Sequence, residues 1–150
     1  MIAVVQRVER ASVTVDSTTV SSIQGGFLIL LGVHRDDTDE DLKLLARKCA
    51  GLRIFTDSEE KMNLSLADTG GEVLVVSQFT LFGDVRRGLR PYFGDAAGPE
   101  KAEEFYEAFM RLLTADGLTV HGGVFGAHMH GEILNDGPVT IILDTRNMYC

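Results

Sequence analysis

The chain has 150 residues, which is enough for one domain with a full core, and we expect a single domain over residues 1–150. Its formal net charge of −8 argues against a general electrostatic field for nucleic acid, so we expect no DNA binding, and RNA binding would require a local cationic patch. The chain lacks a signal-peptide pattern and a membrane-length apolar run, and its two cysteines form neither a disulfide framework nor a metal site, so we expect a cytoplasmic protein with reduced thiols and no membrane contact.

The first residues predict β-strands. Apolar and polar side chains alternate from Ala11 to Asp16, which is the period-two pattern of a half-buried strand. We expect two strands between Ile2 and Asp16, a short strand at 20–23 and a fully apolar strand at 27–33.

A helix is predicted to begin at Thr38. Its hydroxyl can cap the first turn, and the three acidic residues that follow are favoured at the positive end of a helix. Apolar residues then recur at helical spacing on one face, at Leu42, Leu45, Ala46, Cys49 and Leu52. We expect a strand at 53–55 and a charged loop at 56–62, whereas the pattern at 63–68 is ambiguous.

The central stretch combines a core strand with polar residues. The unbroken apolar run from Val73 to Val76 predicts a strand buried on both faces, and we expect it to continue through Ser77, Gln78, Phe79 and Thr80. Burying an unpaired polar group costs about 1–3 kcal/mol. These side chains therefore either bond to neighbouring backbone or serve a ligand, and the pattern leaves both interpretations open.

A basic loop follows this strand. Arg86, Arg87 and Arg90 lie within five positions around Gly88, in a chain that is otherwise acidic. Guanidinium groups match the geometry of phosphate oxygens. The loop therefore predicts an anionic ligand, with phosphate as the natural candidate.

The C-terminal third predicts one more helix and several strands. Pro99 favours a helix start, and Asp116 and Gly117 favour its end. Strands are expected at 118–121, 129–134 and 139–143, the last two joined by Asn135-Asp136-Gly137-Pro138. The glycine-rich stretch 122–127 lacks the strand–GxGxxG–helix order of a dinucleotide site.

Strands outnumber helices in this pattern and come in neighbouring runs. That arrangement predicts an α+β fold, in which two helices cover a mostly antiparallel sheet or barrel-like sheet.

Two common kinds of catalytic site find little support. His121, His128 and His130 have only Glu132 as a nearby carboxylate, so solvent-facing imidazoles are the better interpretation, and we expect no metal and no cofactor. Ser77 has no nucleophile elbow around it, and Thr80 would be a weak nucleophile without an activating base.

The Gly137-Pro138 pair has two possible interpretations. An ordinary hairpin turn is one. The other is a rigid turn that presents bare carbonyls to a small ligand, because glycine has no Cβ and proline has no N–H. The bond before proline can also be cis.

The ordered motifs resemble those of the D-aminoacyl-tRNA deacylase family from end to end. The resemblance rests on the segments 5–8, 61–63, 76–81, Gly88 with Arg90-Pro91, 123–127 with Met129, and 135–140. Leu89, Tyr92, His128, His130 and Gly131 depart from the family pattern, which leaves the substrate preference open.

The resemblance implies a homodimer with active sites at the interface and with tRNA as its partner. Ser77, Gln78, Phe79 and Thr80 would form the catalytic floor. Gly137 and Pro138, in the cis form, would reach in from the other subunit, held by Arg7. The resemblance assigns the rest of the substrate pocket to Phe125, Gly126, Ala127, Met129 and Asn135, and the tRNA phosphates to the three arginines.

The implied reaction is hydrolysis of the ester that joins a D-amino acid, or glycine, to the 3′ end of tRNA. Backbone N–H groups near Phe79 and Thr80 would stabilise the oxyanion, and a hydroxyl of the terminal ribose could activate water. Carbonyls of Gly137 and Pro138 close to Cα would reject an L side chain by a clash.

Two alternatives to this reaction stay open. One is a small-ester or small-amide hydrolase with Thr80 as nucleophile, which would act without tRNA. The other is a non-catalytic RNA-binding module that holds phosphate through Arg86, Arg87 and Arg90.

Overall fold

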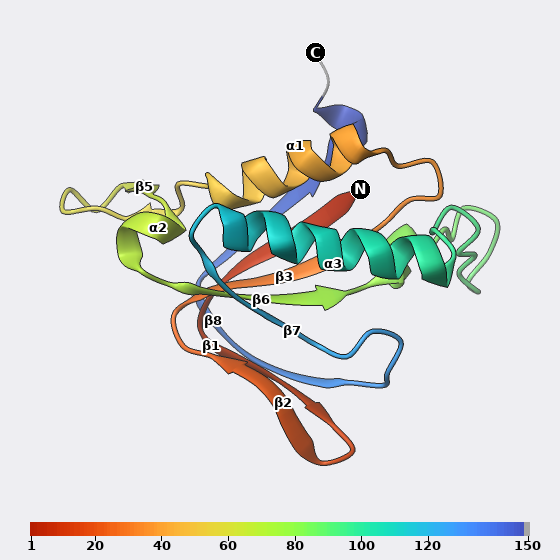
Figure 1. Ribbon diagram of the computed structural model, residues 1–150, viewed down its shortest axis with the longest axis horizontal. Coiled ribbons are helices and arrows are strands. Elements are labelled where there is room, and N and C mark those ends of the chain that lie inside the picture. The colour runs from red at the N-terminus through yellow and green to blue at the C-terminus, as the bar shows by residue number, and fades with distance from the viewer. Residues whose placement is uncertain (149–150) are drawn as a thin grey trace.

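The computed structural model describes residues 1–148, so the prediction for the Cys150 thiol lies outside the described residues. Its main sheet has the strand order β2-β1-β3-β6-β7, and β8 pairs with the free side of β1 (Figure 1). The strands are β1 (Ile2–Val15), β2 (Thr18–Ile23), β3 (Gly26–Gly32), β6 (Glu72–Ser77), β7 (Thr119–Gly122) and β8 (His130–Asp144).

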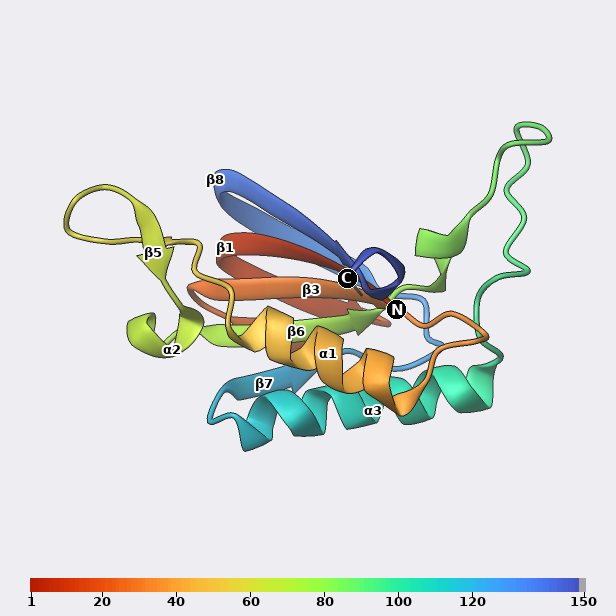
Figure 2. The same cartoon turned by 90° about the horizontal axis from the view of Figure 1, so that it is seen from above.

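Helices α1 (Asp39–Ala50) and α3 (Pro99–Ala115) lie on the same face of the sheet (Figures 1 and 2). Side chains of one parity from the central strands, such as Phe27, Ile29 and Val75, pack beneath them in the main core. A smaller cluster, which includes Leu28 and Leu74, fills the other face of the same strands. The sheet curls around that second face and is nearly closed, which confirms the predicted α+β, barrel-like fold.

The helix signals in the sequence correspond closely to the structure. Thr38 is the N-cap of α1 and forms a reciprocal capping box with Asp41, and Pro99 lies in the first turn of α3. Helix α1 ends at Ala50, so Leu52 packs against the core from the segment after the helix. Within residues 1–148, no helix combines the length and the apolar character needed to cross a bilayer.

The prediction of two strands between Ile2 and Asp16 was wrong. Residues 2–15 form one continuous strand, β1, whose register shifts on both sides of Val8. The first half of β1 pairs with β3 and the second half pairs with β2. These irregularities allow one strand to leave one pairing partner and meet the next.

The prediction of two strands joined by a turn at 135–138 was also wrong. Strand β8 is continuous from His130 to Asp144 and pairs antiparallel with β1 along its length. In the register, Thr140 lies opposite Gln6 and Asn135 lies opposite Val8, so residues 136–139 all face the single position of Arg7. The Gly-Pro segment is therefore a bulge of several residues within a long edge strand.

Strand β6 ends earlier than predicted. Its parallel pairing with β3 stops at Leu31 and Ser77, and residues 79–82 form a 3₁₀ turn, η1 (Phe79–Phe82). The turn packs closely on β3, since a Cβ added to Gly32 would lie 2.9 Å from the ring of Phe82. The prediction that the strand continues through Thr80 was therefore wrong beyond Ser77.

The segment between α1 and β6 forms a small separate ribbon. Strand β4 (Phe55–Thr56) begins two residues later than the predicted strand, and it pairs with β5 (Met62–Leu64). A one-turn helix, α2 (Leu66–Thr69), follows with its own capping box, and a last 3₁₀ turn, η2 (Thr145–Asn147), follows β8.

Candidate active site

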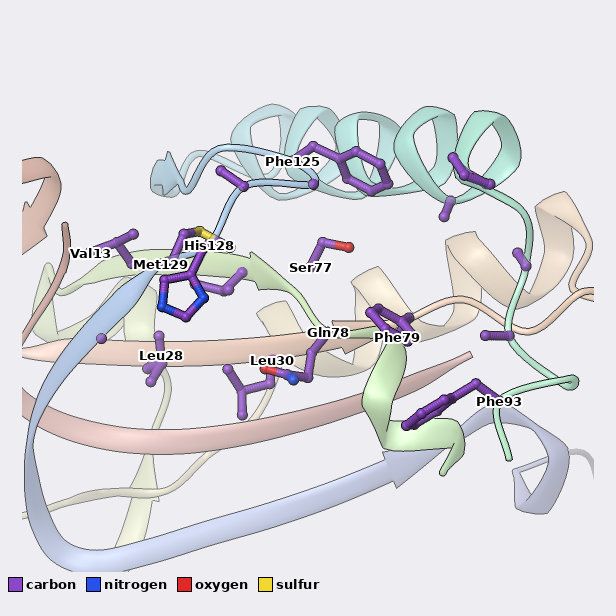
Figure 3. Close-up of a pocket in the computed structure, with 18 of the residues that line it drawn as sticks. Val13, Leu28, Leu30, Ser77, Gln78, Phe79, Phe93, Phe125, His128 and Met129 are labelled. Carbon is purple, nitrogen blue, oxygen red and sulfur yellow. The ribbon is translucent and has the colours of Figure 1, made fainter. Parts of the chain in front are cut away.

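A cavity of about 790 Å³ opens on the face of β3 and β6 that points away from the main core (Figure 3). Its apolar side is formed by strand side chains, namely Val13, Leu28, Leu30 and Val76. The N-terminal end of α3 and the segment before it supply a second side, through Ala96, Ala97, Pro99 and Ala102. The cavity therefore offers an apolar surface large enough for a small organic group.

Polar groups enter this cavity where β6 ends. Ser77, Gln78 and Phe79 all line it, because the chain leaves the sheet there and turns into η1 (Figure 3). The carboxamide of Gln78 contacts the hydroxyl of Thr80, and Thr80 itself does not line the cavity. The Thr80 hydroxyl accepts this contact, and its side chain lies outside the cavity of this chain.

The backbone of the turn offers donors at the same place. In a 3₁₀ turn the first N–H groups have no acceptor within the helix. In η1 these groups belong to Phe79 and Thr80, whereas the N–H of Leu81 donates to the carbonyl of Gln78 at 3.3 Å. The turn therefore presents two backbone donors at the end of β6.

Two aromatic rings stand at the side of the cavity. Phe79 is 55% exposed and makes an edge-to-face contact with Phe93, with ring centroids 5.1 Å apart. Both rings line the cavity (Figure 3). An exposed aromatic surface beside an apolar cavity is suited to a flat ring system.

The segment after β7 forms another side of the cavity. Phe125, Gly126, Ala127 and Met129 line the cavity, and the N–H of Ala127 donates to the carbonyl of Val124 at 3.2 Å. Gly126 has φ of 74°, a backbone conformation that favours glycine. We call residues 124–129 the wall segment. The fold thus brings it together with Ser77, Gln78 and Phe79, which are about fifty positions away in the sequence.

The histidines occupy different places. His128 lines the cavity and its ring contacts that of His130, with centroids 5.1 Å apart. His121 instead pairs with Glu72 at 3.1 Å on the neighbouring strand. Among residues 1–148, no three histidine, cysteine or acidic side chains are grouped closely enough to hold a metal ion.

Gly137 and Pro138 lie outside the cavity of their own chain. Both are exposed on the edge strand β8, and the peptide bond between them is cis. The buried Arg7 holds this bulge: its Nε donates to the carbonyl of Asp136 at 3.0 Å, and its Nη1 donates to the carbonyl of Ile54 at 2.6 Å. Asn135, on the same strand, is also exposed and outside the cavity.

The basic loop forms an arm, residues 84–92, closed by backbone bonds between Asp84 and Tyr92. Arg86 is paired within the arm, because its Nε and Nη2 donate to the two carboxylate oxygens of Asp84 at 2.9 and 2.6 Å. This pairing raises the pKa of Arg86 and lowers the pKa of Asp84 to about 2. Arg87 and Arg90 are exposed and form no ion pair with another described residue.

Comparison with sequence models of protein families identifies the family to which the chain belongs. A sequence model of the D-Tyr-tRNA(Tyr) deacylase family matches residues 4–144. The chain belongs to this family. The resemblance seen in the motifs is therefore confirmed, and the match spans both the η1 turn and the Gly-Pro bulge.

Relatives with this family's activity in their names match over the full chain. Proteins named D-aminoacyl-tRNA deacylase from Thermotoga petrophila and Koribacter versatilis are each 56% identical to this chain over 149 residues, which is 99% of this chain and 100% of theirs.

Solved structures agree with the fold. A structure titled c-Myc DNA Unwinding Element Binding Protein superposes with a TM-score of 0.90 at 44% identity, covering 96% of this chain and 98% of that one. A structure of a probable eukaryotic D-amino acid tRNA deacylase has a TM-score of 0.79 at 21% identity. The superposition covers 95% of this chain and 97% of that one. The second likeness concerns the fold alone.

The deacylase family motifs do not mark every residue of the cavity. Phe93 and the start of α3 line it, although the sequence assigned neither of them to the site, because only the fold brings them to the end of β6. Tyr106 fits the apolar stripe of α3, yet its hydroxyl is bonded to the backbone of Val75 and Gly123. A hydroxyl on an otherwise apolar helix face was the one feature of the sequence that could have indicated such a buried hydrogen bond.

Proposed function

We propose that this protein hydrolyses the ester bond between a D-amino acid and the 3′ end of tRNA. The observation that carries the proposal is identity of 50–56% with relatives named D-aminoacyl-tRNA deacylase, across 99% of the chain. The reaction releases a free D-amino acid and tRNA. We place it in the cytoplasm, where aminoacylated tRNA is used.

The cavity suits the aminoacyl end of such a substrate. Its apolar sides, together with the exposed ring of Phe79, would hold the terminal base and the amino acid side chain. Ser77 and Gln78 would supply the polar contacts that orient the ester, because their side chains are the polar groups at the end of β6. The wall segment would close the opposite side.

The reaction needs little help from catalytic side chains, because an aminoacyl ester is already activated. Water attacks the carbonyl carbon, and the backbone N–H groups of Phe79 and Thr80 stabilise the oxyanion that forms. The bond from that carbon to the ribose oxygen then breaks, and the ribose oxygen takes up a proton. A neighbouring hydroxyl of the same ribose is suited to orient the water and pass on the proton.

We propose that chirality is read by Gly137 and Pro138 of a second copy of the chain. In one copy these residues are exposed on the edge strand β8, which carries the exposed apolar side chains Ile133, Leu134 and Ile142. An open, apolar edge strand favours pairing with another chain. In the homodimer the two carbonyls would lie close to the substrate Cα, where an L side chain would clash. Glycine has no side chain to reject, so glycyl-tRNA would also be hydrolysed.

The arm would hold the tRNA backbone. Because Arg86 is engaged by Asp84, we assign the phosphate contacts chiefly to Arg87 and Arg90, which are exposed. The arm lies beside the cavity, since the chain that leaves it continues directly through Phe93. A local cationic arm would allow a chain with a net charge of −8 to bind RNA.

Two hydrolysis assays and one binding assay test the proposal. The protein is incubated with D-aminoacyl-tRNA, with the ethyl ester of the same D-amino acid, and with uncharged tRNA in a binding assay. We expect release of the amino acid from tRNA and none above background from the free ester. Equal cleavage of the free ester would favour a small-ester hydrolase with Thr80 as nucleophile, and tRNA binding without release would favour an RNA-binding module.

A further inference from the structure

A glycine pair marks the point where β7 becomes the wall segment. Gly122 is the last residue of β7, and Gly123 follows it. The hydroxyl of Tyr106, from α3, donates to the carbonyl of Val75 at 2.9 Å and accepts from the N–H of Gly123 at 3.0 Å. The side chain of Tyr106 is therefore bonded to β6 and to the first residue after β7 at once.

A second hydroxyl holds the same pair from the other side. Ser21, on β2, donates from its Oγ to the carbonyl of Gly122, a contact between residues about a hundred positions apart. Strand β2 lies at the opposite end of the sheet order from β7, so this bond spans the gap in the nearly closed sheet. The N–H of Gly123 also donates to the carbonyl of Val75 at 3.2 Å. One hydroxyl from a helix and one from a strand thus reinforce a glycine pair that is already bonded to β6 through its backbone.

The close approach explains why position 122 carries glycine. A Cβ on Gly122 would lie 2.7 Å from the phenolic oxygen of Tyr106, whereas the nearest neighbour of a Cβ on Gly123 would be the sulfur of the flexible Met129 side chain, at 2.7 Å. Gly122 therefore belongs to the Tyr106 contact, although the glycine-rich stretch has no place in a dinucleotide site.

The ring of Tyr106 extends the contact to the cavity. It packs against the ring of Phe125, with centroids 6.1 Å apart, and Phe125 lines the cavity (Figure 3). Tyr106 and Ser21 do not line the cavity themselves. A phenol is protonated at neutral pH, and burial raises the pKa of Tyr106 above its ordinary value.

We propose that Tyr106, with Ser21 opposite, is a positioning residue that sets the distance between the wall segment and the Ser77–Phe79 floor of the cavity. This inference rests on the proposed function for its kinetic consequence. It requires no contact between Tyr106 and the substrate. A loosened wall would leave the ester less well aligned with the backbone donors of η1, and small misplacements of this kind reduce rates strongly.

The test is Tyr106→Phe, which keeps the ring packing on Phe125 and removes only the hydroxyl. With D-aminoacyl-tRNA we expect kcat to fall about tenfold while KM changes less than about twofold, because the arm that binds tRNA is untouched. Ser21→Ala should act in the same direction. Thr114→Val is the matched control, since it removes a hydroxyl of the same helix that bonds only to the carbonyl of Met110.

A second measurement needs no substrate. Amide hydrogen exchange, followed by NMR, should quicken at Gly123 and across the wall segment in Tyr106→Phe, and stay unchanged there in Thr114→Val. Unchanged exchange at Gly123 and across the wall segment would overturn the positioning role. Faster exchange with unchanged kcat would also overturn it, because the wall would then move without consequence. If the unaltered protein released no amino acid, the proposed function would fail, and the exchange result would still decide whether Tyr106 holds the wall.

Discussion

Arg7→Lys tests the bulge that carries Gly137 and Pro138. Arg7 is buried, and its guanidinium donates to two carbonyls in different segments, those of Asp136 and Ile54. A lysine ammonium cannot span both with the same geometry, so one of the two carbonyls loses its charged donor. A hydrogen bond to a charged group contributes about 1.5–3 kcal/mol, and we expect a loss of stability of that order.

That magnitude has two measurable consequences. In a protein of this size about 1 kcal/mol shifts Tm by roughly 2–4 °C, so Tm should fall by about 3–12 °C. A bulge whose native position is weakened by the same free energy populates other positions roughly ten to a hundred times more often. If the bulge excludes L side chains, the ratio of rates on D- and L-aminoacyl-tRNA should fall by about tenfold or more.

Arg10→Lys is the matched control. Arg10 lies on the same strand but is exposed and holds no backbone carbonyl among the described residues, so both readouts should stay at the values of the unaltered protein. A lower Tm with an unchanged D-to-L ratio would refute the reasoning, because the bulge would then stabilise the fold without selecting substrate. An unchanged Tm would show that the two carbonyl contacts contribute nothing.

Three further outcomes are expected from the structure. Thr80→Ala should retain activity within about tenfold, since a true nucleophile costs several orders of magnitude when removed, and a trapped acyl ester on Thr80 would contradict this. Replacing Arg87 and Arg90 with Ala should flatten the salt dependence of tRNA binding by about 0.7–0.9 in log–log slope per lost phosphate contact, whereas Arg86→Ala, already paired, should change it little. Cys49, buried with its pKa raised to about 12, should resist alkylation at pH 8 until the protein is unfolded, as mass mapping would show.

Local signals in the sequence predicted the helices well. Thr38 with Asp41, and Pro99 after Gly98, act within one turn of the residues that they cap, so no knowledge of the rest of the fold is needed. The apolar run before Ser77 likewise predicted a buried strand, which the parallel pairing of β6 with both β3 and β7 explains. The family resemblance rested on the same kind of contiguous motifs.

Long-range pairing explains what the sequence could not predict. Asn135 to Pro138 have the composition of a hairpin turn, and only the register with β1, more than a hundred residues away, makes them a bulge. The pairing of Arg86 with Asp84 is local, but the Asp-x-Arg spacing is equally compatible with two free side chains. The role of Tyr106 depends on Gly122 and Gly123, which the chain brings to it only in the folded state.

The proposed roles of the cavity and of the Gly-Pro bulge both require stereospecific hydrolysis by the unaltered protein. One tRNA is charged in separate reactions with the D and the L form of the same amino acid, and release is followed for both with the protein and with buffer alone. We expect rapid release from D-aminoacyl-tRNA and release from L-aminoacyl-tRNA at the rate of buffer alone. Equal release from both forms, or from neither, would contradict stereospecific hydrolysis.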